Sequence, residues 1–119
     1  MQNFIIYHNP RCSKSRQTLA LIEANKVQVN IVFYLDNPMS EDEITEILQQ
    51  LNLKPRDLLR KNESIYKEMN LSDDSLLDNQ LITAMANNPK LIERPIVSNG
   101  KRAVIGRPPE NILNLINRK

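Results

Sequence analysis

The stretch HNPRCSKSR, residues 8 to 16, holds the only cysteine and the only histidine of this 119-residue chain. It lies between an apolar run, FIIY, and a segment whose apolar residues have helical spacing. A cysteine between a strand and the first turn of a helix faces free backbone N–H groups and the positive end of the helix dipole. Both favour the thiolate, which is the nucleophilic form of cysteine. The sequence therefore predicts that Cys12 is reactive.

The polar neighbours of Cys12 support this interpretation. Ser15 can donate a hydrogen bond to the sulfur. Further positive potential is expected from three basic residues close in sequence, which are Arg11, Lys14 and Arg16. These flanks argue against the alternative that Cys12 is a small apolar residue of the core. For His8 two interpretations stay open: it caps the strand end, or it assists Cys12 as a charge or proton partner.

Two familiar patterns of cysteine enzymes are absent. A phosphatase of the C-x5-R type needs arginine at position 18, which is Thr18. A dithiol oxidoreductase needs a second cysteine at position 15, which is Ser15. Because one cysteine cannot form an internal disulfide, any redox cycle at Cys12 must take its second thiol from another molecule.

The elements that position Cys12 follow from the local pattern. NFIIYH is apolar and predicts a strand, and VQVNIVFY predicts a second one. Between them Ser13 can cap a helix that runs from Ser15 to Lys26. Residues 1–36 are therefore expected to form a βαβ unit with parallel strands.

Helices dominate the middle of the chain. Ser40 and Glu43 match the S-x-x-E capping box, and Pro55 is expected in the first turn of a short helix that contains Arg60. Residues 40–89 thus read as a mainly helical insertion.

The last part of the chain, residues 94–119, predicts a β-hairpin and a final helix. Asn99-Gly100 between two apolar runs is a strong hairpin signal. The order of elements is that of a thioredoxin- or glutaredoxin-like α/β fold, a mixed sheet with a helical insertion. Residues 1–119 are expected to form one domain.

Composition narrows the function classes. The formal net charge is +2 and the basic residues are not gathered in one stripe, which argues against nucleic-acid binding. One histidine and one cysteine are too few for a structural zinc site, so no metal is expected. Without a bilayer-spanning apolar run or a visible signal peptide, the chain is expected in the cytoplasm and away from membranes. The lone cysteine fits that reducing compartment.

Four pieces of the sequence point to one family: YHNPRCSKSR, LLRKNE, NNPKLIERPIV and IGRPPE. In their order and spacing the chain resembles the glutaredoxin-coupled arsenate reductases, nearly from end to end, and especially their short bacterial members. Related thiol-stress regulators that bind RNA polymerase share the fold but typically carry C-x-x-C, so Ser15 favours the reductase branch. One departure is Ser13-Lys14, where better-known members have Gly-Thr, and it leaves the physiological substrate open.

The resemblance implies a thioredoxin-like fold with a helical insertion and a specific set of site residues. Cys12 matches the catalytic cysteine, while His8 and Ser15 match residues that support the thiolate. Pro95 matches the cis-proline that faces the cysteine. The oxyanion-binding residues of the family match Arg60, Arg94 and Arg107.

The activity that the resemblance implies is reduction of arsenate to arsenite. Glutathione would be the co-substrate and glutaredoxin the partner, with no bound cofactor and a monomeric chain. Two alternatives stay open: a glutathione-dependent thiol-disulfide oxidoreductase of other substrates, and a non-enzymatic, partner-binding regulator of the same fold.

Overall fold

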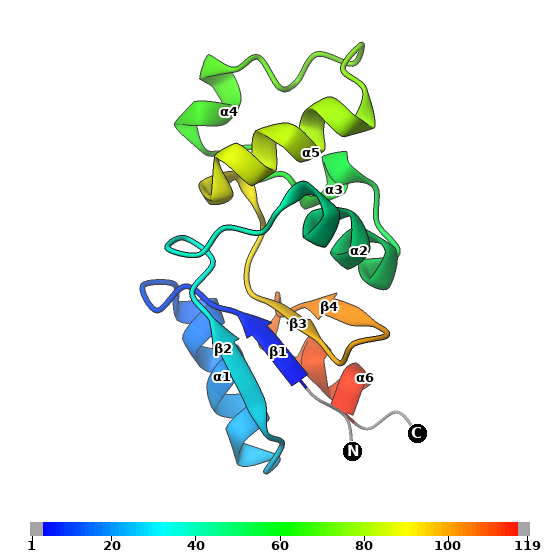
Figure 1. Ribbon diagram of the computed structural model, residues 1–119. Helices are drawn as coiled ribbons and strands as arrows, with labels where there is room; N and C mark the ends of the chain where they lie inside the picture. Colours follow the sequence, from blue (N-terminus) through cyan, green and yellow to red (C-terminus); the bar gives the residue numbers. More distant parts are fainter. Residues whose placement is uncertain (1–3, 117–119) are drawn as a thin grey trace.

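The fold is built around a four-stranded mixed sheet with the order β2-β1-β3-β4 (Figure 1). In this computed structural model, which describes residues 4–116, β1 (Phe4–Tyr7) pairs in parallel with β2 (Val29–Val32). On its other side β1 pairs antiparallel with β3 (Ile96–Ser98), and β3 pairs antiparallel with β4 (Ala103–Ile105). The expected βαβ unit and C-terminal hairpin are therefore confirmed in one sheet.

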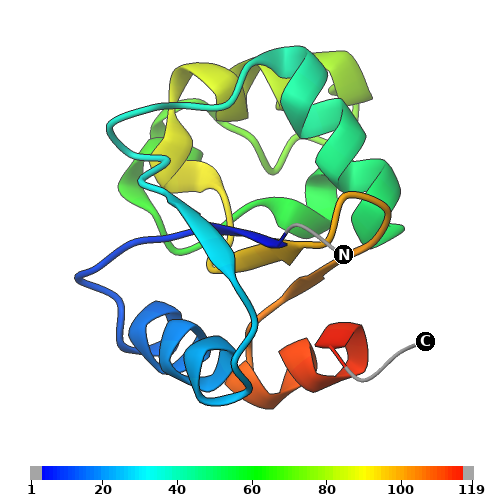
Figure 2. The ribbon, with the colours of Figure 1, turned by 60° about the horizontal axis from the view of Figure 1, so that its bottom comes forward.

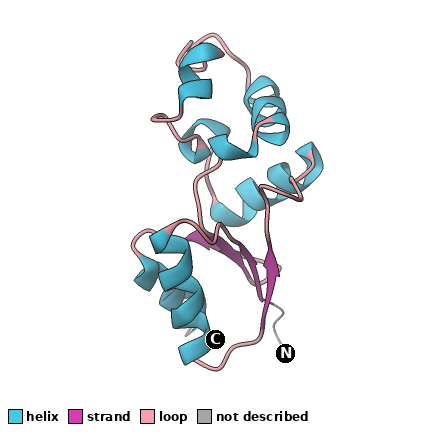
Figure 3. Cartoon of the chain, turned by 90° about the vertical axis from the view of Figure 1, so that its left-hand side faces the viewer, coloured by secondary structure: helices cyan, strands magenta, loops and turns pink. Residues whose placement is uncertain are grey.

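Helices cover both faces of this sheet (Figure 2). One face carries α1 (Ser13–Ala24), the short 3-10 helix η2 (Pro109–Ile112) and α6 (Leu113–Ile116). Beyond the other face lies the helical insertion, which consists of α2 (Glu41–Leu51), α3 (Pro55–Leu58), α4 (Ser64–Glu68), α5 (Asp78–Asn87) and the 3-10 helix η1 (Pro89–Leu91). Seen from the side, the sheet with α1 forms one end of an elongated molecule and the insertion forms the other (Figure 3).

The alternation of side chains along the strands explains why both faces are covered. Phe4 and Ile6 of β1 and Val97 of β3 are buried in the cluster beneath α1 and α6. Ile96, next to Val97, is buried in the other cluster, together with Tyr34 and the apolar side chains of the insertion. Since neighbouring residues of a strand point to opposite faces, the central strands supply two cores at once.

The local signals at helix ends predict the start of α2 correctly but misplace both ends of α1. The capping box is confirmed, since Ser40 and Glu43 exchange two hydrogen bonds of 3.1 Å. The predicted start of α1 was wrong: Cys12, with extended backbone (φ −95°, ψ 122°), is the N-cap, and Ser13 is already helical. The predicted end was also wrong, because α1 stops at Ala24 and Lys26 has a left-handed backbone (φ 58°).

Two further expectations need correction. Arg60 lies beyond α3, because Leu59 is extended (φ −76°, ψ 136°) and forms an antiparallel bridge with Ile92. The turn of the hairpin spans residues 99–102 and not only the expected pair Asn99-Gly100. Within this turn Gly100 takes a positive φ of 93°. Asn3 of the predicted first strand and residues 117–119 of the predicted last helix lie outside the described residues. None of the helices within residues 4–116 has the length and apolar character needed to cross a membrane.

The strand order, the parallel β1–β2 pair and the closing hairpin together make up a thioredoxin-like fold with a helical insertion. The predicted fold class is thereby confirmed. The carboxyl ends of β1 and β2 point toward the insertion, and the loop with Cys12 begins there (Figure 1).

Candidate active site

The loop between β1 and α1 places Cys12 at the amino end of the longest helix. The N–H of His8 extends the parallel pairing with a 2.8 Å bond to the carbonyl of Val32. The chain then turns, and the N–H of Cys12 donates to the carbonyl of Asn9 over 3.0 Å. In the first helical bond, the N–H of Arg16 donates to the carbonyl of Cys12. Cys12 is thus fixed at the helix end by backbone bonds on both sides.

The surroundings of Cys12 favour its thiolate. Burial, which leaves the residue 8% exposed, would raise the pKa of the thiol. The backbone N–H of Ser15, the charge of Arg94, the backbone N–H of Lys14 and the charge of Arg107 together outweigh burial, so the pKa of Cys12 lies below its usual value. The strongest cationic effects therefore come from arginines distant in sequence, not from the side chains of the basic residues beside Cys12.

Ser15 has a different role from the one expected of its hydroxyl. Ser15 is fully buried, and its Oγ shares a 2.6 Å hydrogen bond with Nδ1 of His8. The same Oγ accepts a 3.0 Å bond from the N–H of Asn9. The hydroxyl of Ser15 therefore ties the ends of the Cys12 loop together, and its backbone N–H is the group that favours the thiolate.

His8 is almost completely buried, at 5% exposed. Its pKa is lowered, mainly by burial and further by the charge of Arg16. The ring also packs against Phe33, with 5.9 Å between centroids. A neutral imidazole that supports the loop through Ser15 fits these surroundings.

Two arginines from the C-terminal hairpin region act on the cysteine through their charges. Nη1 of Arg107 lies 3.9 Å from Sγ of Cys12 and also donates to the carbonyl of Arg94 over 3.2 Å. Nε and Nη1 of Arg94 are buried and have no hydrogen-bond partner among the described residues. Buried polar groups are normally paired, so these donors mark a place for an acceptor beside the thiolate.

The backbone around these arginines is closely packed. The Arg94–Pro95 and Arg107–Pro108 peptide bonds are both cis. The N–H of Gly106 donates to the carbonyl of Pro95 over 2.9 Å, which joins the two segments. A side chain at Gly106 would meet Pro95 and Thr18 of α1, so glycine permits the close approach of hairpin and helix.

Arg60 is placed differently from Arg94 and Arg107. Its Nη1 donates to Oε2 of Glu63 over 2.7 Å, and its Nε lies 3.4 Å from Oε1 of Glu93. Arg60 is not among the strongest of the groups that lower the pKa of Cys12. Of the three arginines expected at the oxyanion, Arg107 thus contacts the sulfur, Arg94 acts on it through its charge, and Arg60 is held by two carboxylates.

Tyr34 is a neighbour of the site that the sequence interpretation missed. It is 2% exposed, and burial raises the pKa of Tyr34 to about 12, against the charges of Arg94 and Arg60. The charges of Cys12 and Glu93 raise the same pKa further. One signal could have found it: Tyr34 follows the strand parallel to β1, and the carboxyl ends of parallel strands meet at one edge of a sheet.

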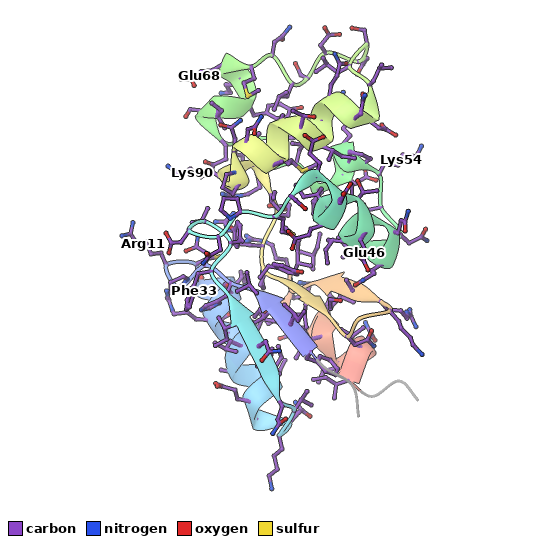
Figure 4. The ribbon with its side chains drawn as sticks, viewed as in Figure 1. Arg11, Phe33, Glu46, Lys54, Glu68 and Lys90 are labelled. Atoms are coloured by element: carbon purple, nitrogen blue, oxygen red, sulfur yellow. The ribbon has the colours of Figure 1, made fainter. Side chains whose placement is uncertain are left out.

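The outer side of the Cys12 loop is exposed to solvent at Pro10 and Arg11. Arg11 points outward from the loop and lies near Phe33, which is 42% exposed (Figure 4). Within residues 4–116, no three His, Cys, Asp or Glu side chains gather in a group that could hold a metal ion.

Comparison with known proteins places this site in a family. The ArsC family model matches residues 7–115. The Escherichia coli K12 protein YfgD, itself uncharacterised, is 49% identical over 112 residues, which cover 93% of this chain and 94% of YfgD. An arsenate reductase of Haemophilus influenzae is 44% identical over 113 residues, covering 94% of this chain and 97% of the relative.

The fold agrees with the sequence relatives. The solved structure of an arsenate reductase from Vibrio cholerae is 47% identical, with a TM-score of 0.93 over 95% of this chain and 97% of that one. The residues matched by the family model, 7–115, include the loop with Cys12 and the helical insertion. These matches in sequence and in structure show that the chain belongs to the ArsC family.

Proposed function

We propose that the chain reduces arsenate to arsenite, with Cys12 as the nucleophile and glutathione as the co-substrate. The observation that carries the proposal is the buried Cys12, whose pKa is lowered beside Arg107 and beside the unpaired donors of Arg94. Relatives from Haemophilus influenzae and Vibrio cholerae that bear the name arsenate reductase support the choice of substrate.

The electrostatics of the site suit an attack of one anion on another. Arsenate and a thiolate repel each other at bonding distance unless cations lie between them. A guanidinium keeps its charge and can hold two oxygens at once, so Arg94 and Arg107 are suited to bind the oxyanion and the charge that grows in the transition state.

The proposed cycle has three steps. The thiolate of Cys12 attacks arsenic and forms an S–As bond, and one oxygen of arsenate leaves as water after taking up protons. The thiolate of glutathione then attacks Sγ of Cys12. The S–As electron pair passes to arsenic, which leaves as arsenite, and a Cys12–glutathione disulfide remains. Glutaredoxin reduces this disulfide, and the two electrons come from thiols throughout.

The need for an outside thiol follows from the count of cysteines. Cys12 is the only one in the chain, so no internal disulfide can close the cycle. In the proposed cycle, glutathione and glutaredoxin supply the missing thiols, which suits a reducing compartment such as the cytoplasm.

The alternative enzyme activity, thiol-disulfide exchange, differs from arsenate reduction in its use of the arginines. A thiol-disulfide oxidoreductase of other substrates attacks a neutral disulfide and has no use for several cations around an oxyanion. Arg94→Lys keeps the charge but loses the planar fork of donors. We therefore expect this variant to lose about tenfold to a hundredfold in kcat/KM for arsenate, the worth of one charge-assisted hydrogen bond, with little change in attack on a disulfide.

The decisive experiment is a coupled assay of arsenate-dependent NADPH consumption with glutathione, glutathione reductase and glutaredoxin. Turnover should require Cys12 and disappear in Cys12→Ser. Arg102→Gln, on the hairpin turn, is the control and should keep full activity. Robust turnover with thioredoxin as sole reductant would contradict the cycle. No arsenate turnover beside rapid disulfide exchange would favour the alternative.

A further inference from the structure

The guanidinium of Arg60 is held between two carboxylates. Glu63 accepts a 2.7 Å hydrogen bond from Nη1, and Glu93 forms an ion pair of 3.4 Å with Nε. The side chains are partly buried, with exposed fractions of 23% for Arg60, 26% for Glu63 and 32% for Glu93. Two carboxylates and one guanidinium carry one net negative charge, which is unexpected beside a site for an anion.

Backbone pairing builds this cluster into the site. Leu59 and Ile92 form an antiparallel bridge, flanked by a 2.7 Å bond from the N–H of Arg60 to the carbonyl of Leu91. On the other flank, the N–H of Glu93 donates to the carbonyl of Leu58 over 2.9 Å. Glu93 directly precedes Arg94, whose donors are unpaired, and Glu93 and Arg107 line the same hollow, so the cluster borders the expected oxyanion site.

Tyr34 connects the cluster with the thiolate. The charges of Arg94, Arg60, Cys12 and Glu93 all act on its hydroxyl group. These groups therefore lie around Tyr34, in one region between the sheet and the insertion, and the Arg60 cluster borders the place where Arg94 would hold an anion. One oxygen of each carboxylate contacts Arg60, which leaves the second oxygen of each to accept a hydrogen bond.

We propose that Glu63 and Glu93 make the site selective for oxyanions that keep an O–H group near neutral pH. Arsenate and phosphate keep such a group, whereas sulfate has lost both protons. A protonated oxyanion can donate its O–H to a carboxylate in a charge-assisted hydrogen bond. Sulfate and a carboxylate are both acceptors only, so they repel each other. The proposal rests on the proposed function and names the residues that would select among its anions.

The expected preference for phosphate over sulfate equals the contribution of one hydrogen bond to a charged group. Such a bond is worth about tenfold to a hundredfold in affinity. Because both carboxylates are partly exposed, we expect the lower end, with phosphate bound about tenfold more tightly than sulfate. Glu93→Gln keeps an oxygen for Nε of Arg60 but also supplies an amide donor for sulfate, so the ratio of the two dissociation constants should fall close to one.

The test is a titration of the intact protein with phosphate or sulfate at constant ionic strength, followed through the backbone amide NMR signals of residues 8–15. Glu63→Gln provides a second, independent variant and should lower the ratio in the same direction. Glu68→Gln is the matched control, because Glu68 is exposed near the outer end of α4 and its substitution changes the net charge equally (Figure 4). It should leave the ratio at the wild-type value.

The outcomes separate the inference from the proposed function. If both anions bind with the wild-type ratio in Glu93→Gln and Glu63→Gln, the carboxylates do not select and the inference is wrong, while the oxyanion site stands. If both variants weaken phosphate and sulfate equally, the carboxylates only support Arg60, and the inference is again wrong. If neither anion shifts the signals of residues 8–15 in the wild-type protein, the oxyanion site itself is refuted, and the proposed function with it.

Discussion

Replacing Arg107 by glutamine should reduce the reactivity of Cys12 by an amount that the geometry sets. Nη1 of Arg107 lies 3.9 Å from Sγ. Opposite unit charges at that distance attract by about 4 kcal/mol at an effective dielectric constant of about 20. Arg107 is exposed, so solvent screening lowers its effect to about 1 kcal/mol. The charge favours the thiolate, and its removal should cut the thiolate population about fivefold at a pH below the pKa of Cys12.

The assay is the rate of alkylation by iodoacetamide as a function of pH. Arg107→Gln should react about fivefold more slowly than the wild type at low pH and reach the same rate once the thiol is fully ionised. Arg102→Gln removes an equal charge at the other end of β4 and should follow the wild-type curve. An Arg107→Gln curve that coincides with the wild type would refute the reasoning. The low pKa of Cys12 would then come from Arg94 and the helix N–H groups alone.

Three further predictions concern the stability of the loop and its supports. Ser15→Ala should lower the free energy of unfolding by about 1–3 kcal/mol, because the buried His8 ring loses its partner; an unchanged urea midpoint would contradict this. Gly106→Ala should cost about 1–3 kcal/mol, since the new methyl group would meet Thr18, and thermal unfolding would reveal it. The pKa of His8 is lowered in the fold, chiefly by burial, so the unfolded chain takes up its proton first; stability should therefore fall as pH drops below about 6.5, and His8→Gln should flatten that slope.

Local patterns predicted most elements because each depends on near neighbours in sequence. The capping box at Ser40 and Glu43 satisfies helix N–H groups three residues apart, and it forms as expected. The start of α1 was misplaced because cysteine is an uncommon N-cap, and the preference for serine pointed to Ser13 instead. Arg60 fell outside α3 because pairing between Leu59 and Ile92, more than thirty residues apart, competes with the helix.

The sequence by itself determined that this chain has one cysteine, that it lies at a helix end, and that any redox cycle on it must take a second thiol from another molecule. Both follow from residue types and near-neighbour spacing, which need no tertiary contacts. Which charges act on Cys12 was decided only by the tertiary structure, because the fold brings Arg94 and Arg107, which are distant in sequence, to the loop that follows β1. Electrostatic interactions depend on distance in space. Arg11, next to Cys12 in sequence, therefore affects the pKa of Cys12 less than Arg107, which is 95 residues away along the chain.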